Sequence, residues 1–134
     1  MGGMFYETPF NQPIGNWSVS SVTNMHNMFF GTPFNQSIEN WDTGKVTKMS
    51  NMFKQAKAFN QPIGDWNVSS VTDMEGMFVR ASSFNQPVGK WDVSSVTNMI
   101  SLFQETPFNQ PLGNWNVSAV KNMRAMFGGA DALS

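Results

Sequence analysis

Five tryptophans recur along this chain at steps of 24, 25, 25 and 24 residues. They are Trp17, Trp41, Trp66, Trp91 and Trp115. A fixed period of roughly 20–50 residues is typical of proteins built from stacked repeats, in which each repeat contacts mainly its neighbours. We therefore expect residues 1–134 to form a single repeat array of about five units, truncated within a repeat at both ends. The units begin near residues 10, 34, 59, 84 and 108.

The repeat unit contains two local patterns, and its consensus is F-N-Q-P-I-G-N-W-x-V-S-S-V-T-N-M-x-x-M-F. Trp17-Ser18-Val19 alternates apolar and polar residues, which predicts a short strand over residues 16–20. Met25, Met28 and Phe29 are spaced at i, i+3 and i+4, which predicts one face of a short helix. We therefore expect an α/β solenoid whose coils each hold a short parallel strand and a short helix. The matching strands fall at residues 40–44, 65–69, 90–94 and 114–118.

Equivalent positions of successive units, which we call columns, often hold the same residue. Such columns predict ladders of stacked side chains that run through the array. We expect the apolar positions of each unit to stack on their copies and form the interior. In the first unit these are Phe10, Ile14, Trp17, Val19, Val22, Met25, Met28 and Phe29. An asparagine recurs without exception, at Asn11, Asn35, Asn60, Asn85 and Asn109. We interpret this column as an amide ladder that bonds turn backbone or its own copy; a ligand-binding row is the alternative.

Composition excludes several classes of partner. Charged residues are 13% of the chain and the net charge is −1, so we expect no nucleic-acid partner. The sequence has no run of about 18 apolar residues, so we expect no membrane insertion. The N-terminus lacks the basic start and apolar run of a secretory signal. The absence of cysteine excludes disulfides and thiolate chemistry.

Catalytic and metal-binding patterns are weak. The single histidine, His26, lies in the most variable column and is expected to point to solvent. Zinc would need cysteine or a second histidine, and the carboxylates are too scattered for a calcium-binding repeat. Thioethers bind copper(I), but the methionine spacing is better explained by a core. We therefore predict no enzymatic activity, no cofactor and no metal site.

The consensus motif resembles the roughly 25-residue repeat of BspA-like leucine-rich-repeat surface proteins, which are found in bacteria, mycoplasmas and some protists. The resemblance covers nearly the whole chain. It implies leucine-rich-repeat-like coils in a larger exported or lipid-anchored protein, and an extracellular or cell-surface location. It also implies adhesion or partner binding without a catalytic motif.

From these patterns we expect a non-enzymatic protein-interaction or adhesion module with an unknown protein or glycan ligand. Binding would use outward columns that vary between units. The favoured face, next to the predicted strands, is Asn16, Asn40, Asp65, Lys90 and Asn114. The alternative face, on the predicted helices, is His26, Ser50, Glu75, Ile100 and Arg124.

Three other interpretations remain open at this stage. A carbohydrate-binding or ice-binding array would use the tryptophan row, or serine and threonine rows that Gly44 and Lys121 interrupt. A cluster of Lys45, Lys48, Lys54 and Lys57 is either a solvated face or an anion site. Self-association through uncapped ends is expected to use apolar residues of the terminal units. These are Met1, Met4, Phe5 and Phe10 at one end and Met123, Met126, Phe127 and Leu133 at the other.

Overall fold

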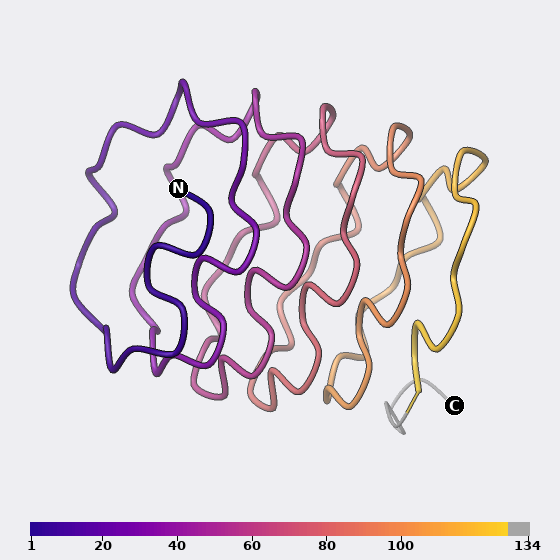
Figure 1. The fold of residues 1–134 in the computed structure, drawn as a ribbon. Coiled ribbons are helices and arrows are strands. Elements are labelled where there is room, and N and C mark those ends of the chain that lie inside the picture. The colour runs from indigo at the N-terminus through magenta and orange to yellow at the C-terminus, as the bar shows by residue number, and fades with distance from the viewer. Residues whose placement is uncertain (129–134) are drawn as a thin grey trace.

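The computed structural model describes residues 1–128, which wind into a stack of similar coils (Figure 1). The coils follow one another in sequence order, so the first and the last described coils lie at opposite ends of this stack. We number the coils by their residues: coil 1 is 10–33, coil 2 is 34–58, coil 3 is 59–83, coil 4 is 84–107 and coil 5 is 108–128. Residues 1–9 form a partial coil before coil 1.

Neither helices nor extended strands build these coils. Within residues 1–128 there is no helix, and regular pairing is limited to isolated parallel β-bridges. The bridges join Asn24 to Lys48, Lys48 to Asp73, Asp73 to Asn98, and Asn98 to Asn122. The predicted α/β solenoid of strand-plus-helix coils is therefore wrong, and so is its leucine-rich-repeat-like character. The expected strands at 16–20 and its copies are absent, because the pairing occurs at a different point of the repeat.

Hydrogen bonds between coils replace the predicted helix. The backbone N–H of Met25 donates to the carbonyl of Lys48 at 2.9 Å, and that of Asn27 donates to Ser50 at 3.0 Å. The N–H of Met28, the next residue, donates to the carbonyl of Met25 at 3.3 Å, three residues back. Alternate N–H groups therefore reach the next coil while the others close tight turns. Every one of these donors is satisfied without the i to i−4 bonds of a helix.

Left-handed backbone at fixed positions is incompatible with a helix in this segment. Asn27 has a φ of 58° and Gly31 a φ of 70°, and both positions recur with positive φ in the partial coil and in coils 2 to 4, while coil 5 has Ala125 at the first of them. Asparagine and glycine tolerate this conformation best. Their copies with positive φ are Gly3, Glu7, Asn51, Gln55, Gly76, Arg80, Ser101, Glu105 and Ala125.

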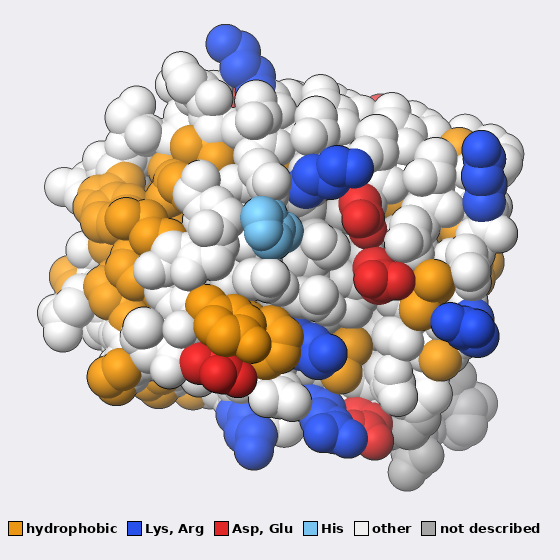
Figure 2. Space-filling model, in the orientation of Figure 1, with side chains coloured by type: hydrophobic (Ala, Val, Ile, Leu, Met, Phe, Trp, Pro, Cys, Tyr) orange, Lys and Arg blue, Asp and Glu red, His pale blue; other side chains and the backbone are white. Residues whose placement is uncertain are grey.

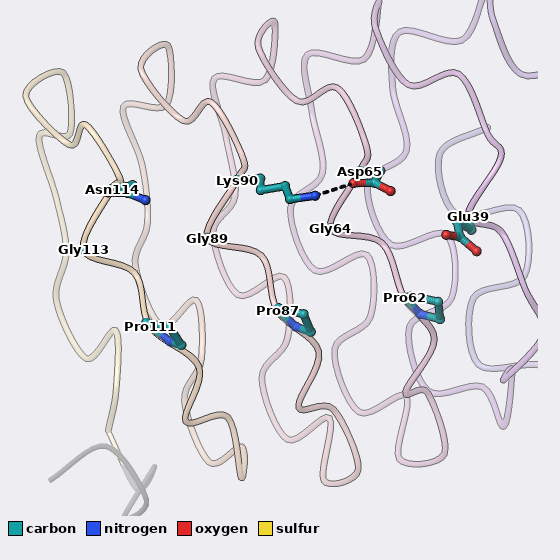
Figure 3. Close-up of a pocket in the computed structure, with 10 residues that line it drawn as sticks. All are labelled: Glu39, Pro62, Gly64, Asp65, Pro87, Gly89, Lys90, Pro111, Gly113 and Asn114. Carbon is teal, nitrogen blue, oxygen red and sulfur yellow. Dashed lines mark hydrogen bonds and ion pairs between the residues drawn. The ribbon is translucent and has the colours of Figure 1, made fainter.

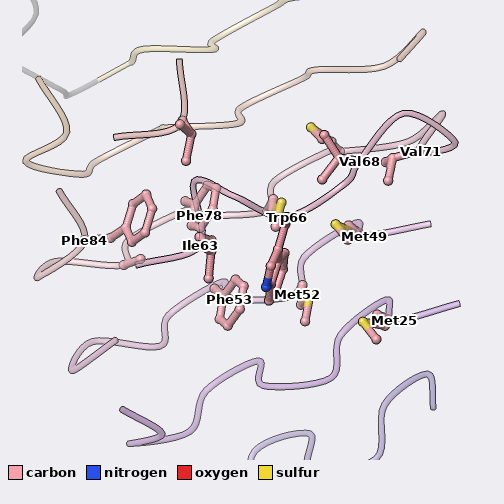
Figure 4. Packing of buried hydrophobic residues seen from close by; sticks show 14 of the residues in the cluster. Met25, Met49, Met52, Phe53, Ile63, Trp66, Val68, Val71, Phe78 and Phe84 are labelled. Carbon is pink, nitrogen blue, oxygen red and sulfur yellow. The ribbon is translucent and has the colours of Figure 1, made fainter. Parts of the chain in front are cut away.

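The predicted interior is confirmed in coils 2 to 4, where every apolar position of the repeat is buried (Figure 4). Phenylalanine rings stack both within a coil and between coils. The ring centroid of Phe53 lies 4.0 Å from that of Phe59 and 5.7 Å from that of Phe78. Such pairs contribute about 0.5–1.5 kcal/mol beyond their burial. The two terminal coils depart from the prediction, because Trp17 of coil 1 and Phe127 of coil 5 are exposed.

Two polar ladders hold neighbouring coils in register. The side-chain Oδ1 of Asn35 accepts the backbone N–H of Asn60 at 3.0 Å, and Asn60 accepts Asn85 in the same way. The indole Nε1 of Trp66 donates to the carbonyl of Ile38 at 3.0 Å. The amide ladder predicted from the asparagine column is therefore confirmed, and the tryptophan column has its own equivalent.

Candidate binding groove

A groove of about 590 Å³ crosses coils 2 to 5 on one side of the stack (Figure 3). Its floor is made of a proline column and a glycine column, and its rim carries charged and amide side chains. We call it the Pro–Gly groove. It is lined by Glu39, Pro62, Gly64, Asp65, Pro87, Gly89, Lys90, Pro111, Gly113 and Asn114.

A tight turn in each coil places these residues. In coil 3 the backbone N–H of Trp66 donates to the carbonyl of Ile63 at 3.1 Å, so Gly64 and Asp65 occupy the middle of the turn. Ile63 and Trp66 are buried. Burial of both turn ends leaves the two central residues to form the groove surface. Coils 4 and 5 repeat the same turn with the N–H of Trp91 and of Trp115.

The glycine column has a steric cause. A Cβ built on Gly64 would lie 2.5 Å from the carbonyl oxygen of Pro87, and one on Gly89 would lie 3.0 Å from that of Pro111. Backbone of the next coil therefore occupies the space where a side chain would begin. A Cβ on Gly113 meets nothing within 4 Å. In coil 2 this column holds Glu39, an exposed side chain that adds a carboxylate to the groove.

The rim of the groove is charged but weakly paired. The Nζ of Lys90 lies 3.3 Å from Oδ1 of Asp65, and the two side chains are 84% and 68% exposed. An ion pair this exposed contributes little to stability because water screens it and both side chains lose freedom. Among residues 1–128, Glu39 forms no ion pair.

A second hollow of about 430 Å³ continues from the groove and shares Gly89, Lys90 and Asn114 with it. It adds Trp91, Asp92, Val93 and Asn116 to the lining. The hydroxyl of Ser94 donates to Oδ1 of Asp92 at 2.6 Å, and the Ser94 backbone N–H does so at 3.0 Å. These bonds lower the pKa of Asp92, the hydroxyl having the larger effect. The carboxylate is therefore charged at neutral pH.

The favoured predicted face is exposed in all five coils, and the structure brings part of it together. Asp65, Lys90 and Asn114 line the groove, whereas Asn40 and Asn16 lie in the same column outside its lining. The prediction did not include Glu39 or the proline and glycine columns. The signal for Glu39 was present in the sequence, since it interrupts a column that is otherwise glycine.

The alternative face does not line either hollow. Ser50, Glu75 and Ile100 are half-buried and Arg124 is exposed. His26 is half-buried, so the expectation that it points freely to solvent is wrong. Its Nδ1 lies 2.5 Å from Oδ1 of Asn24, and its ring fills the space beside Gly2. The partial coil before coil 1 covers this side chain.

The sequence matches a family described as "Mycoplasma protein of unknown function, DUF285", over residues 1–107 and again over residues 63–134. The chain belongs to this family. No curated protein matches it, and no solved structure does. In the described part of this DUF285 chain, no helix has the length and apolarity needed to cross a membrane.

The tryptophan row and the threonine row of this DUF285 chain have structural roles. Trp41, Trp66 and Trp91 are only 3–4% exposed, so their rings offer no stacking platform to a sugar. In the threonine row, the hydroxyl of Thr72 donates to the carbonyl of Thr47 at 3.3 Å, and the row repeats this bond between coils. Both rows therefore hold coils together, which disfavours a carbohydrate-binding or ice-binding array.

The lysine cluster of coil 2 is largely solvated. Lys45, Lys48 and Lys57 are exposed. The Nζ of Lys54 lies 5.2 Å from the ring centroid of Phe30, a cation–π distance. Lys54 thus covers an aromatic ring of the neighbouring coil.

Proposed function

We propose that this chain is a non-enzymatic protein-interaction or adhesion module of a surface-exposed repeat protein. The observation that carries the proposal is that the constant and the variable positions of the repeat have different roles. The constant tryptophan, phenylalanine and asparagine columns are buried or bonded between coils. The variable side chains Asp65, Lys90 and Asn114 instead meet at an open groove.

The character of the groove also supports a binding role. Protein sites that hold ligands are usually concave and mostly apolar, with a few polar groups that set specificity. The proline and glycine floor with a rim of carboxylate, ammonium and amide groups has this character. The resemblance to BspA-like surface repeats is a further support for a surface location, which stays a prediction.

A bead-adhesion assay tests the proposal. Beads coated with residues 1–134 are applied to cultured epithelial cells, and attachment is compared with albumin-coated beads. A matched pair of variants separates the groove from the rest of the surface: Asp65→Lys reverses a charge on its rim, and Glu7→Lys makes the same charge change outside it. We expect attachment above the albumin control, reduced several-fold by Asp65→Lys and unchanged by Glu7→Lys.

The nature of the ligand is read from the same assay after treatment of the cells. Protease treatment should abolish attachment, whereas removal of surface glycans should not. Attachment that is lost on glycan removal would favour the carbohydrate-binding alternative. Attachment no greater than that of albumin-coated beads would contradict the adhesion proposal.

A further inference from the structure

We infer that the Pro–Gly groove accepts an extended segment of a partner protein that carries lysine or arginine side chains. This inference rests on the proposed function and names the ligand class of the same groove. Three observations carry it: the shape of the floor, the excess of negative charge, and the weakness of the pair that now occupies the rim.

The floor suits an extended backbone. Pro62, Pro87 and Pro111 lie in a row across three coils, and Gly64 and Gly89 lie beside them (Figure 3). Proline rings are rigid, so they lose little freedom when a ligand covers them. At Gly64 and Gly89 the backbone of the next coil leaves little room for a side chain. The result is a shallow apolar channel that runs from coil to coil.

The charges along this channel are predominantly negative. Glu39 and Asp65 line the groove, and Asp92 lines the adjoining hollow, against the single cation Lys90. Three carboxylates and one ammonium group give a local charge of −2, compared with −1 for the whole chain. Complementary charge steers and selects a partner more than it adds affinity. A cationic segment is therefore the complementary ligand.

The existing ion pair does not block such a ligand. Lys90 and Asp65 are both well exposed, so little free energy is lost when their contact opens. A basic side chain of the partner can then take the place of Lys90 beside Asp65, while Glu39 accepts another. Paired strands are about 4.8 Å apart, so the one coil step from Glu39 to Asp65 corresponds to roughly 5 Å along the stack, or one to two residues of extended chain. Basic residues one or two positions apart fit this spacing.

Selection from a random dodecapeptide phage library tests this inference. The chain is immobilised, and the amino-acid composition of the bound peptides is compared with that of the unselected library. We expect lysine and arginine to be enriched at least threefold. The enrichment should disappear on the variant Glu39→Lys/Asp65→Lys. It should persist on Glu7→Lys/Glu105→Lys, which carries the same charge change on residues outside both hollows.

A steric variant provides a second measurement. Gly113→Leu adds a side chain in open space, so it should narrow the groove without disturbing the coils. Selected peptides should bind this variant at least tenfold more weakly, while its thermal unfolding, followed by tryptophan fluorescence, stays that of the wild type. Equal binding to wild type and Gly113→Leu would place the peptides elsewhere.

The outcomes separate this inference from the proposed function. Groove-dependent peptides that lack basic residues would overturn the inference and leave the interaction module standing. Failure to select any peptide would overturn it as well, and cell attachment that survives protease would then indicate a glycan ligand. Basic peptides that require Glu39 and Asp65 support it even where the beads do not attach to the cells chosen.

Discussion

Left-handed backbone imposes a local cost at two positions of coils 1 to 4, and residue type decides how large this cost is. Gly76 has a φ of 63°, while Ser101 takes the corresponding conformation with a φ of 57° and a side chain. A non-glycine residue in this region costs roughly 1–2 kcal/mol. The repeat tolerates the cost because bonds to both neighbouring coils hold the backbone in place.

The first prediction separates backbone strain from steric contact. A Cβ on Gly76 would contact Oδ1 of Asn51, whereas one on Gly3, whose φ is 66°, meets nothing within 4 Å. We expect Gly76→Ala to lower the free energy of unfolding by about 1–3 kcal/mol. Gly3→Ala should cost less, since it adds strain without the contact. Chemical denaturation measures both, and equal losses would show that Asn51 moves aside freely.

The second prediction concerns Asp92, whose pKa is lowered first by the Ser94 hydroxyl and then by its N–H. Ser94→Ala removes the hydroxyl bond to the charged form, so the pKa should rise toward the ordinary value of 3.8. The stability that Asp92 contributes is present above the unfolded pKa and is lost as the pH falls through the folded one. Titration of the Asp92 carboxyl by NMR checks the shift. Ser95→Ala, one residue on, should leave the pKa unchanged.

At the scale of the element, ladders take the place that helices and strands have in other folds. The amide ladder gives the third prediction. Oδ1 of Asn60 accepts the N–H of Asn85 at 3.0 Å and Nε2 of Gln86 at 3.2 Å. Asn60→Ala removes this one acceptor and with it both hydrogen bonds, so it should lower the free energy of unfolding by about 1–3 kcal/mol. Asn60→Asp keeps an acceptor in the same place and should cost clearly less. The reverse order in urea unfolding would mean that the amide N–H₂ carries the ladder.

The fourth prediction concerns the buried tryptophan ladder. Trp66 is 4% exposed and stacks on Trp41 with ring centroids 6.4 Å apart. Trp66→Ala should lower the free energy of unfolding by about 3–5 kcal/mol because it leaves a cavity and an unpaired carbonyl. Glu75→Ala, at a variable position, should stay within about 0.5 kcal/mol. Comparable losses at both positions in urea unfolding would contradict the assignment of the core.

Periodicity predicted which side chains are buried but not how the backbone is bonded. Met25, Met28 and Phe29 are all buried, as a helical face requires, yet they lie on consecutive turns. A spacing of i, i+3 and i+4 is compatible with a helix. It is equally compatible with consecutive tight turns when the N–H groups have carbonyl partners on a neighbouring coil. The column of Gly3, Asn27, Asn51 and Gly76 was the available sign of left-handed backbone. It disfavours a helix more than the apolar spacing supports one.

At the scale of the whole molecule, the groove illustrates a second limit of sequence reasoning. Asp65 and Lys90 were predicted as binding residues because their column varies between units. Glu39 and Pro87 join them only through the stacking of coils, which brings residues about 25 positions apart into contact. The column alignment contained this information, but no local pattern shows that turns of adjacent coils enclose a concave surface.

The fifth prediction is that residues 1–134 associate with further copies of themselves. Hydrophobic side chains gather at the end of the stack where coil 1 lies (Figure 2), where Met4, Tyr6 and Trp17 are exposed. The other residues expected to be exposed at this end, Met1, Phe5 and Phe10, are half-buried. On coil 5, Met123 and Phe127 are exposed and Met126 is buried, so the expectation for Met126 is wrong; Leu133 lies outside the described residues. Met4→Lys or Phe127→Lys should shift the chain toward monomer in sedimentation, at unchanged solubility or better. A wild-type chain that is monomeric at every concentration would contradict this expectation.

The direction of association follows from the bonds between coils. In the stack, the N–H of Met99 donates to Asn122, and that of Phe103 donates to Met126. Along this row of bonds, the N–H groups of each coil donate to the following coil, and its carbonyl oxygens accept from the preceding coil. Unlike ends are complementary in the same way, and contact between unlike ends produces an open filament rather than a closed dimer.

The orientation of these bonds also governs how the chain responds to force. The backbone hydrogen bonds that begin at Met25 in coil 1, and their copies, join one coil to the next, so they run along the axis of the stack. Force applied to the two ends therefore acts on the hydrogen bonds of one interface between coils at a time. It does not shear the bonds of several interfaces simultaneously. Each coil that peels away releases about 25 residues, or roughly 90 Å of extended chain. The stack therefore yields in nearly equal steps and lengthens severalfold before its last interface parts.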